Sequence, residues 1–345
     1  MFSKNIIFEN FQNVKKTKLE KKLKKKFDLH CKSKLITSFY KNYNYSFNKK
    51  KIKQYKKFQN FNLIGMGGSS LGAKAIYNFL NQKIKKNFNF VDNISPNKKI
   101  YSPNKTLNII VSKSGETLET ISNFESLKDK SQNLFVCENS NNSLRRIGRK
   151  LMGDIIDHKN FIGGRYSVLS EAGMLPAMLM GLDEKKFKMF DSLKKNRIFI
   201  NELIKNVSFT LNLIKGKKLN SIILNYDEES DDLFKWYQQL IAESLGKKSR
   251  GLLPVISSLP RDNHSMMQMY LDGPKNCFYT FFDVLDNSKN NRLSKIKLSQ
   301  KQATKNIFNR KKIPYRSFDV VKRSETSLGE LFIFFMLETI LLGEM

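Results

Sequence analysis

The chain has 345 residues, of which 62 are Lys or Arg and 31 are Asp or Glu, so its formal charge at pH 7 is +31. A hydrophobic content of 40% is normal for a globular protein, and the length allows a sizeable core divided between two domains. A strongly positive field attracts anions, nucleic acids included. However, no zinc, helix-turn-helix or aromatic nucleic-acid signature accompanies the lysines, so we expect a solvated basic surface and no nucleic-acid partner.

The spacing of the cysteines and the length of the apolar runs indicate in which cellular compartment the chain is expected. Cys31, Cys137 and Cys277 are far apart and form no Cys-x-x-Cys pair, which favours reduced thiols and gives no metal site. The N-terminus lacks the apolar core and cleavage site of a signal peptide. The longest apolar run, 331–342, contains Glu338 and is too short to cross a bilayer. We therefore expect a cytoplasmic protein without membrane contact.

The sequence pattern changes near residue 59, from a Lys-rich segment to alternating strand and helix patterns. Residues 1–58 are Lys-rich with scattered Phe, Tyr and Ile, which predicts one or two amphipathic helices without a catalytic group. Short apolar runs then alternate with helical patterns. The expected strands are 61–64, 88–91, 107–111, 134–137 and 154–157, and the expected helices are 73–80, one from 116, 144–151 and 171–182.

A second alternating stretch follows a helix or helix pair at 185–214. Its expected strands are 221–225, 252–256, 278–284 and 317–321, and its expected helices are 231–245, 265–270, 298–308 and 327–343. Interleaved strands and helices predict parallel sheets with helices on both faces. The predicted fold class is therefore α/β, with two doubly wound parallel-sheet domains at 59–184 and 185–345 after an N-terminal helical segment, 1–58.

The stretch 107–120, LNIIVSKSGETLET, predicts a binding site. An apolar strand leads into six residues with three hydroxyls and a glycine, and a helix follows. Backbone N–H groups, the positive end of the helix dipole and the hydroxyls together suit a bound anion. An ordinary capped turn is the alternative, because Ser and Thr are common N-caps. The helix is expected to bury Leu118, Ile121 and Phe124.

The glycine turn at 65–72, GMGGSSLG, nearly matches a dinucleotide fingerprint, but Ser70 stands at the third glycine position. Asp92 ends the next strand, where a ribose-binding acid would lie. No Gly-Lys-Ser/Thr of a P-loop is present. Gly68 and Ser69 remain as a tight turn that offers backbone N–H groups at a helix start, or as a turn required only for packing.

Three further residues have side chains suited to catalysis. Arg165 follows two glycines at a strand end, where it either pairs with an anion or forms a surface ion pair. Glu243 shares a helix face with Trp236 and Leu240, and partial burial there would suit it to general base chemistry. The alternative is an ordinary helix-end glutamate. His264 lies in a polar loop that opens a helix; by contrast, we expect His30 to be exposed and His158 to be structural.

Five motifs occur in the order GMGGSSLG, SKSGETLET, GGRYSVLSEAG, QQLIAESLGK and DNHSMMQMYLDG. Together they resemble the phosphoglucose isomerase family from about Asn62 to the C-terminus, and SKSGET also resembles the phosphate loop of sugar isomerase (SIS) domains. The resemblance implies two SIS domains of flavodoxin-like plan. It further implies a homodimer whose active site lies between domains and subunits.

The resemblance implies interconversion of glucose 6-phosphate and fructose 6-phosphate, in glycolysis and gluconeogenesis, without a metal or redox cofactor. Ring opening would precede proton transfer through a cis-enediolate. The implied catalytic residues are Arg165 beside the enediolate, Glu243 as the base, and His264, donated by the neighbouring subunit, for ring opening. The implied substrate-binding residues are Gly68, Ser69, Ser112, Lys113 through its backbone, Ser114, Thr117 and Gln239.

Two departures from the family pattern keep alternatives open. Gly115 and Glu116 stand where many members have a bulkier aromatic residue and a threonine, which makes the loop more like general SIS proteins. The family also continues into a tail with a catalytic lysine, to which no residue here corresponds, so slow ring opening is expected. One alternative is a sugar-phosphate-binding SIS protein with little or no turnover. The other, a nicotinamide-dependent dehydrogenase, fits the polar SKSGET loop poorly.

Overall fold

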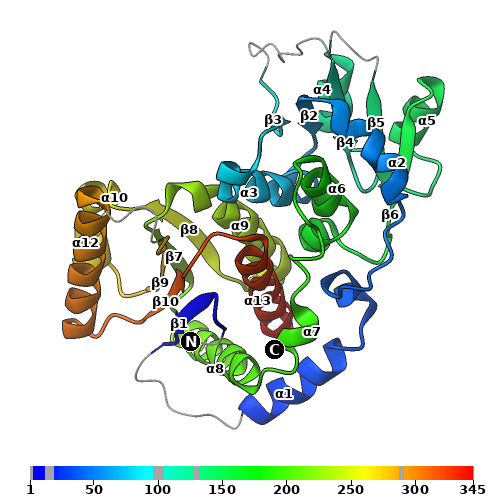
Figure 1. Ribbon diagram of the computed structural model, residues 1–345. Coiled ribbons are helices and arrows are strands. Elements are labelled where there is room, and N and C mark those ends of the chain that lie inside the picture. The colour runs from blue at the N-terminus through cyan, green and yellow to red at the C-terminus, as the bar shows by residue number, and fades with distance from the viewer. Residues whose placement is uncertain (1–2, 12–18, 96–104, 128–131, 287–290, 345) are drawn as a thin grey trace. The chain divides into compact units, whose positions relative to one another are not determined.

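The computed structural model describes residues 3–11, 19–95, 105–127, 132–286 and 291–344, which fold into two compact units (Figure 1). The first-sheet unit comprises residues 33–188, and the second-sheet unit comprises residues 1–32 with 189–345. Each unit contains one five-stranded sheet with flanking helices. The predicted α/β class with two doubly wound sheets is confirmed. Residues 1–58 are divided between the two units, with 1–32 in one and 33–58 in the other.

All strands of the first sheet are parallel and occur in the order β3-β2-β4-β5-β6. They are β2 (Asn60–Ile64), β3 (Asn87–Val91), β4 (Thr106–Val111), β5 (Asn133–Glu138) and β6 (Asp154–His158). Chain order reverses at β2, since β3 lies on one side of it and β4 on the other. In open sheets of this type, ligands bind at the carboxyl ends of the strands where the order reverses. That position is the junction of β2 and β4.

Helices α4 (Leu118–Glu125) and α5 (Ser143–Lys150) pack on the first sheet through a common apolar cluster. On the helices this cluster includes Phe124 and Leu144. The expectation that α4 buries Leu118 is wrong, because that side chain is 72% exposed, and Ile121 is half-buried. Leu118 is the first residue of the helix and therefore projects beyond the sheet surface that Phe124 covers. Two further helices, α3 (Leu71–Phe79) and α6 (Glu171–Leu179), pack against each other.

A row of asparagines crosses the first sheet. The side-chain amide of Asn89 donates to Asn62 at 3.0 Å, Asn62 donates to Asn108 at 2.9 Å, and Asn108 donates to Asn133 at 3.1 Å. The parallel register places these residues on neighbouring strands side by side. Buried amides are costly without partners, so any slip of the strands would break the row. The row therefore fixes the register of the strands that lead into the loops at the carboxyl edge.

The second sheet has the order β1-β10-β9-β7-β8. Its strands are β1 (Ile6–Glu9), β7 (Asn220–Asn225), β8 (Leu253–Ser258), β9 (Cys277–Val284) and β10 (Tyr315–Val320). The N-terminal segment contains helices α1 (Leu19–His30) and α2 (Lys49–Lys53), as predicted, but β1 was not expected. It pairs antiparallel with β10, Ile6 opposite Val320. A strand of four residues is too short to show a clear sequence pattern, and its pairing partner lies at the other end of the chain, so local sequence does not predict it.

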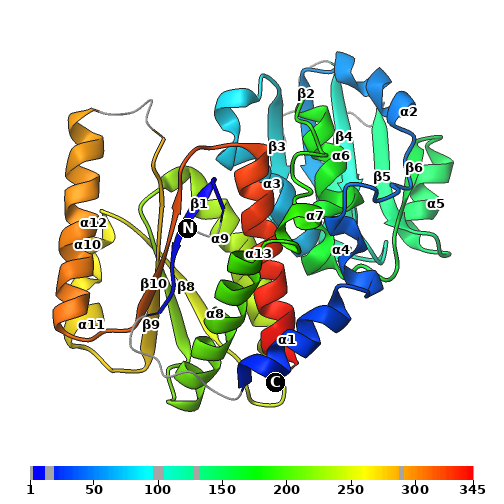
Figure 2. The ribbon, with the colours of Figure 1, turned by 60° about the horizontal axis from the view of Figure 1, so that its bottom comes forward.

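Helices cover both faces of the second sheet (Figure 2). On one side are α8 (Arg197–Lys215), α9 (Asp231–Leu245) and α13 (Glu325–Gly343), and on the other are α10 (Asp262–Ser265), α11 (Met267–Asp272) and α12 (Arg292–Arg310). The helix or helix pair expected at 185–214 consists of α7 (Phe190–Leu193) and α8. Phe308 of α12 and Tyr270 of α11 pack on β7, β9 and β10.

Helix α13 is long and apolar enough to cross a membrane by length and composition, but 89% of its apolar window is buried inside the protein. This burial is typical of a core helix. Glu338 of α13 forms an ion pair with Arg316 of β10, and both side chains are 1% exposed. Asn206 donates to Glu338 at 2.6 Å, and Arg316 donates to Tyr237 at 3.1 Å. The buried charges are thus paired, as burial requires.

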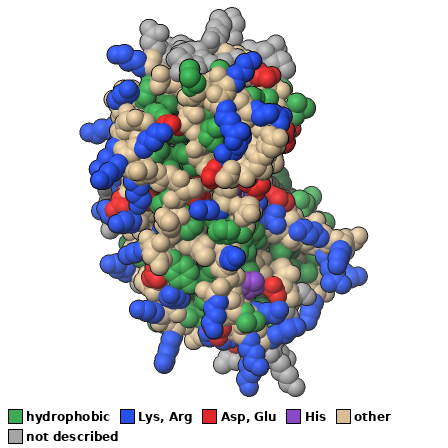
Figure 3. Space-filling view, turned by 90° about the vertical axis from the view of Figure 1, so that its right-hand side faces the viewer, with side chains coloured by type: hydrophobic (Ala, Val, Ile, Leu, Met, Phe, Trp, Pro, Cys, Tyr) green, Lys and Arg blue, Asp and Glu red, His purple; other side chains and the backbone are tan. Residues whose placement is uncertain are grey.

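Lys and Arg side chains are spread over the face of the molecule shown in Figure 3 and alternate there with polar and acidic groups. They do not gather in a single patch on that face. This is the distribution of a solvated basic surface.

Candidate active site

The loop after β4 lies at the predicted ligand-binding edge of the first sheet. Ser112 is 1% exposed, and its hydroxyl lies 2.8 Å from that of Thr117 and accepts the N–H of Gly115 at 3.1 Å. Thr117 is the N-cap residue of α4, yet its side chain makes no capping hydrogen bond to the helix. An ordinary capped turn would use that hydroxyl on the helix. The first turn of α4 therefore keeps N–H groups available for an acceptor outside the helix.

The side chains of Lys113 and Ser114 differ in their surroundings. Lys113 Nζ donates to the carbonyl of Asn160 at 2.9 Å and pairs with Glu138 at 3.3 Å. The Lys113 side chain is therefore already bound to neighbouring residues of the protein. A ligand in this loop would contact Lys113 through its backbone. Ser114 is exposed, and its hydroxyl accepts the N–H of Glu116 at 3.2 Å. The Ser114 hydroxyl proton remains available to donate to an anion.

The two glycine loops of the first-sheet unit are packed together. A Cβ on Gly68 would lie 2.3 Å from the carbonyl oxygen of Gly164, so only glycine fits there. The Ser167 hydroxyl lies within hydrogen-bond distance of both carbonyls, 3.2 Å from Gly68 and 2.6 Å from Gly164. Arg165 is half-buried, with its guanidinium 5.3 Å from the ring centre of Tyr166. This packing brings Arg165 to the glycine turn that carries Ser69.

The glycine turn also meets the end of β4. A Cβ on Gly65 would approach the carbonyl of Val111 to 2.9 Å, one residue before Ser112. The turn at 65–69, the loop at 112–117 after β4 (the serine loop) and the loop that carries Arg165 therefore meet at one edge of the sheet. Asp92, which a dinucleotide site would use for a ribose, instead pairs with Lys74 at 2.8 Å. This pairing disfavours the dinucleotide alternative.

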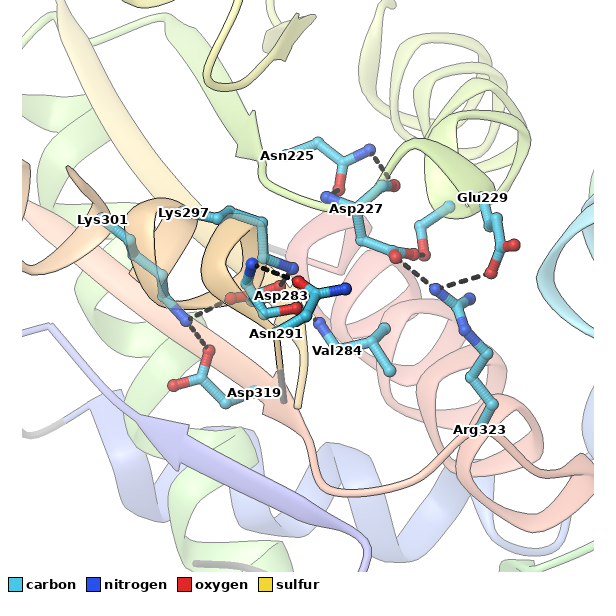
Figure 4. Close-up of polar contacts among 12 residues, drawn as sticks. Asn225, Asp227, Glu229, Asp283, Val284, Asn291, Lys297, Lys301, Asp319 and Arg323 are labelled. Atoms are coloured by element: carbon cyan, nitrogen blue, oxygen red, sulfur yellow. Dashed lines mark hydrogen bonds and ion pairs between the residues drawn. The ribbon is translucent and has the colours of Figure 1, made fainter. Parts of the chain in front are cut away.

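The corresponding edge of the second sheet is filled by ion pairs (Figure 4). Asp283 is fully buried and contacts Lys297 at 2.6 Å and Lys301 at 3.4 Å. Arg323 pairs with Asp227 and, at 2.8 Å, with Glu229. Carboxylates there repel a phosphate, and the cations are already paired. Among the described residues, the hydroxyl-rich loop at 112–117 in the first-sheet unit is thus the better candidate for an anion site.

Gln239 and Glu243 lie one turn apart near the end of α9. The expectation that Glu243 is partly buried is wrong in this chain, because Trp236 and Leu240 are buried whereas Glu243 is exposed. Glu243 lies in the last turn of the helix, beyond the core that covers its neighbours on the same face. The amide of Gln239 donates to Glu243 Oε2 at 3.1 Å, which orients the carboxylate.

His264 lies in the short helix α10 and is exposed. Strand β8 separates it from Glu243. Gln238 of α9 donates to the carbonyl of Pro254, near the start of β8, and Asp262 accepts the N–H of Ser258, at its end. A six-residue strand is about 20 Å long. Glu243 and His264 therefore do not meet within one chain.

The other histidines have structural surroundings. His158 is 3% exposed, its Nδ1 lies 3.0 Å from the carbonyl of Lys159, and burial lowers the pKa of its imidazole. His30 is half-buried beside Glu344, at 3.3 Å, so the expectation that it is exposed is wrong. No cluster of three or more His, Cys, Asp and Glu side chains able to hold a metal occurs in the described residues.

Residues 142–144 were not singled out from the sequence, although they contact the serine loop. Leu144 donates its N–H to the carbonyl of Gly115 at 3.0 Å, and Ser143 donates its N–H to Glu116 at 2.7 Å. An Asn before a helical pattern is an N-cap signal, which locates the start of α5 in the sequence. It does not reveal that this start faces the serine loop.

Comparison with known proteins identifies the family of the chain. The model of the phosphoglucose isomerase family matches residues 40–257, a stretch that contains every predicted site residue except His264. Glucose-6-phosphate isomerase of Methanocaldococcus jannaschii is 30% identical over 333 residues, which cover 87% of this chain and 82% of the relative. The Campylobacter jejuni enzyme of the same name is 33% identical over 269 residues, covering 69% of this chain and 63% of the relative.

Solved structures share the fold. A hypothetical protein from Thermus thermophilus superposes with a TM-score of 0.80 at 21% identity, covering 94% of this chain and 89% of that protein. A glucose-6-phosphate isomerase from Chlamydia trachomatis gives 0.72 at 19% identity, covering 85% and 67%. The family match and the relatives together show that the chain belongs to the phosphoglucose isomerase family of aldose–ketose isomerases.

Proposed function

We propose that this chain interconverts glucose 6-phosphate and fructose 6-phosphate in the cytoplasm, as a step of glycolysis and gluconeogenesis. One observation carries the proposal furthest: the serine loop ends in a helix whose N-cap hydroxyl does not cap it. Ser112, Ser114 and Thr117, the backbone of Lys113, and the turn at Gly68 and Ser69 would hold the phosphate. Binding of the phosphate, which is remote from the reacting carbons, would supply energy that positions these carbons for proton transfer.

The chemistry requires a base, a cation and an acid, and no redox cofactor. Glu243 would move the proton between C2 and C1, with Gln239 orienting its carboxylate. Arg165 would stabilise the negative charge that develops on the enediolate oxygens. Its half-buried position over Tyr166 limits the motion of the guanidinium, which suits a preorganised charge.

His264 would open the sugar ring in a neighbouring subunit of a homodimer. Two observations support this arrangement. The length of β8 keeps His264 away from Glu243 of its own chain. Met266 and Met269 are 37% and 58% exposed beside it, and methionine is enriched at protein interfaces. Each site would then combine groups from two chains.

The test is a coupled assay of the purified chain. Fructose 6-phosphate is supplied, and glucose 6-phosphate is followed with an added NADP-dependent dehydrogenase, while calorimetry measures binding. Turnover of fructose 6-phosphate is expected, whereas free fructose, followed by NMR because the coupled assay does not detect glucose, should remain unchanged. Binding without turnover would instead support the sugar-phosphate-binding SIS protein that remains the alternative. Absence of both would overturn the phosphate assignment.

A further inference from the structure

The serine loop contains an acidic residue, Glu116, next to Thr117. A carboxylate beside an anion site is unfavourable unless its charge is held elsewhere. The Glu116 side chain is exposed, yet its Oε1 accepts the N–H of Ser143 at 2.7 Å. Hydrogen bonding with Ser143 holds the pKa of Glu116 below its ordinary value. The charge is thus placed at the N-terminus of α5, where the helix dipole stabilises it.

The N-terminus of α5 is satisfied largely by this loop. Its first N–H, from Ser143, is bound to Glu116, and its second, from Leu144, is bound to the carbonyl of Gly115 at 3.0 Å. Its third, from Arg145, is bound to the N-cap side chain of Asn142 at 2.9 Å. By contrast, the N-cap side chain of α4 makes no such bond. Of these two helix ends, α4 is the one left for an anion.

Asn142 also explains the glycine in the loop. Gly115 has a φ of +70°, and a Cβ there would lie 2.1 Å from Asn142 Oδ1. Asn142 is 2% exposed, and its amide donates to the carbonyls of Glu138 at 3.0 Å and Ser140 at 3.3 Å. Asn142 thus fills the space that a larger residue at position 115 would occupy.

We propose that Glu116 and Asn142 are positioning residues that fasten the sugar-phosphate loop to the N-terminus of α5, so that α4 alone receives the phosphate. Glu116 engages a helix end that would otherwise compete for the anion, and it fixes Thr117 beside Ser112. The inference rests on the proposed function of the loop. It assigns Glu116 no contact with the substrate.

Ser143→Pro offers a selective test. Proline is favoured at the first helical position and lacks an N–H, so this change removes the donor to Glu116 and leaves the backbone hydrogen bonds within α5 intact. Ser143→Ala is the matched control, because it removes only the hydroxyl, which accepts from Arg146 at 2.8 Å. Loss of the exposed hydrogen bond that holds the loop to α5, taken at the net value of a typical protein hydrogen bond, predicts a Kd for glucose 6-phosphate roughly 2- to 12-fold higher in Ser143→Pro, with Ser143→Ala unchanged.

Variants at position 116 separate the hydrogen bond from the charge. Glu116→Ala removes the charge together with the bond, so it should weaken binding no more than Ser143→Pro does, and the double variant should match Glu116→Ala. Glu116→Gln keeps an acceptor and should restore binding. In Ser143→Pro and Glu116→Ala the KM should rise while kcat is preserved, whereas a purely structural lesion would lower the melting temperature without this split.

Two results would overturn the inference. One is an unchanged affinity in Ser143→Pro, and the other is a Glu116→Gln variant as weak as Glu116→Ala. In both cases binding by the unmodified chain leaves the proposed function standing. If the unmodified chain itself fails to bind glucose 6-phosphate, the proposed function and the inference fall together.

Discussion

The hydroxyl of Thr117, at the start of α4, lies 2.8 Å from the hydroxyl of Ser112, at the end of β4. This contact turns the N-cap side chain of a helix toward a strand end instead of toward the helix. Two hydroxyls and an uncapped helix start then face the same space. A phosphate binds well in such a place, because helix N–H groups and hydroxyls all donate to it.

Replacing Ser112 and Thr117 together by alanine should therefore weaken sugar-phosphate binding. Each hydrogen bond lost to a charged group is worth roughly 1.5–3 kcal/mol. Calorimetry with glucose 6-phosphate measures the loss, and Ser122→Ala, an exposed serine of the same helix, is the control. Wild-type affinity in the double variant would remove the loop from the phosphate site.

Most of the fold could be predicted from local patterns. Nine strands, β2 to β10, were found because short apolar runs with β-branched residues lie between glycine turns and amphipathic helices. The row of asparagines from Asn62 to Asn133 was missed, because its meaning depends on register between strands. The same limit hid β1, whose partner β10 lies at the opposite end of the chain.

The sequence suggests residue types for the candidate site but does not reveal the surroundings of their side chains. Helical spacing put Glu243 on the face of Trp236 and Leu240, but spacing does not reveal where the core stops. Likewise, the sequence SKSGET suggested donors to an anion, but not that Glu116 is bound by Ser143. Both features depend on contacts between elements that are distant in sequence.

Glu243→Gln should preserve the fold and phosphate binding but lose proton exchange at C2 of the substrate. A glutamine at this position can still bond to Gln239 but cannot accept the proton. General base catalysis typically contributes ~10²–10⁴-fold, so exchange of deuterium from C2 into water, followed by NMR, should fall by that order. Glu228→Gln, an exposed carboxylate before the same helix, should exchange normally. Near-normal exchange in Glu243→Gln would exclude this residue as the base.

A mixture of His264→Ala and Glu243→Gln subunits should regain partial activity. Each variant alone is expected to be inactive, and β8 separates the two positions within one chain. In a mixed dimer, one of the two sites can combine an intact Glu243 from one subunit with an intact His264 from the other. Activity is measured after subunit exchange, with each variant mixed with itself as the control. No recovery despite proven exchange would show that each subunit uses its own histidine.

Lys188 is a buried amine that the proposed chemistry does not use. Its side chain is 1% exposed and donates to the carbonyls of Ser38 at 2.5 Å and Leu169 at 2.7 Å. Its ammonium lies 4.7 Å from the ring centre of Tyr43 and 4.9 Å from that of Tyr45. Burial lowers the pKa of Lys188 from 10.5 to about 7, although nearby Glu171 and Glu184 oppose the shift and Lys49 adds to it.

This shift makes the stability of the first-sheet unit depend on pH. Above about pH 7 the folded chain releases the Lys188 proton, whereas the unfolded chain keeps it up to 10.5. The unfolded state then binds more protons, so the free energy of unfolding should rise with pH, by at most ~1.4 kcal/mol per unit. Burial raises the pKa of the Cys137 thiol in the same unit, so the predicted rise ends near pH 9.0, where the unfolded thiol ionises. Burial of Tyr43 and Tyr45 raises their pKa values and opposes the rise further near pH 10.

Lys188→Met should abolish this rise between about pH 7.5 and 8.5, the range that lies between the two limits. Because the chain has two units, hydrogen exchange of the β4 and β5 amides is the suitable measurement, since it reports opening of the first-sheet unit alone. Lys186→Met, an exposed neighbour, should keep the wild-type slope. If Lys188→Met retains the slope as well, Lys188 is charged in the folded chain throughout this range, and its ammonium is stabilised by Glu171 and Glu184 more strongly than burial opposes it.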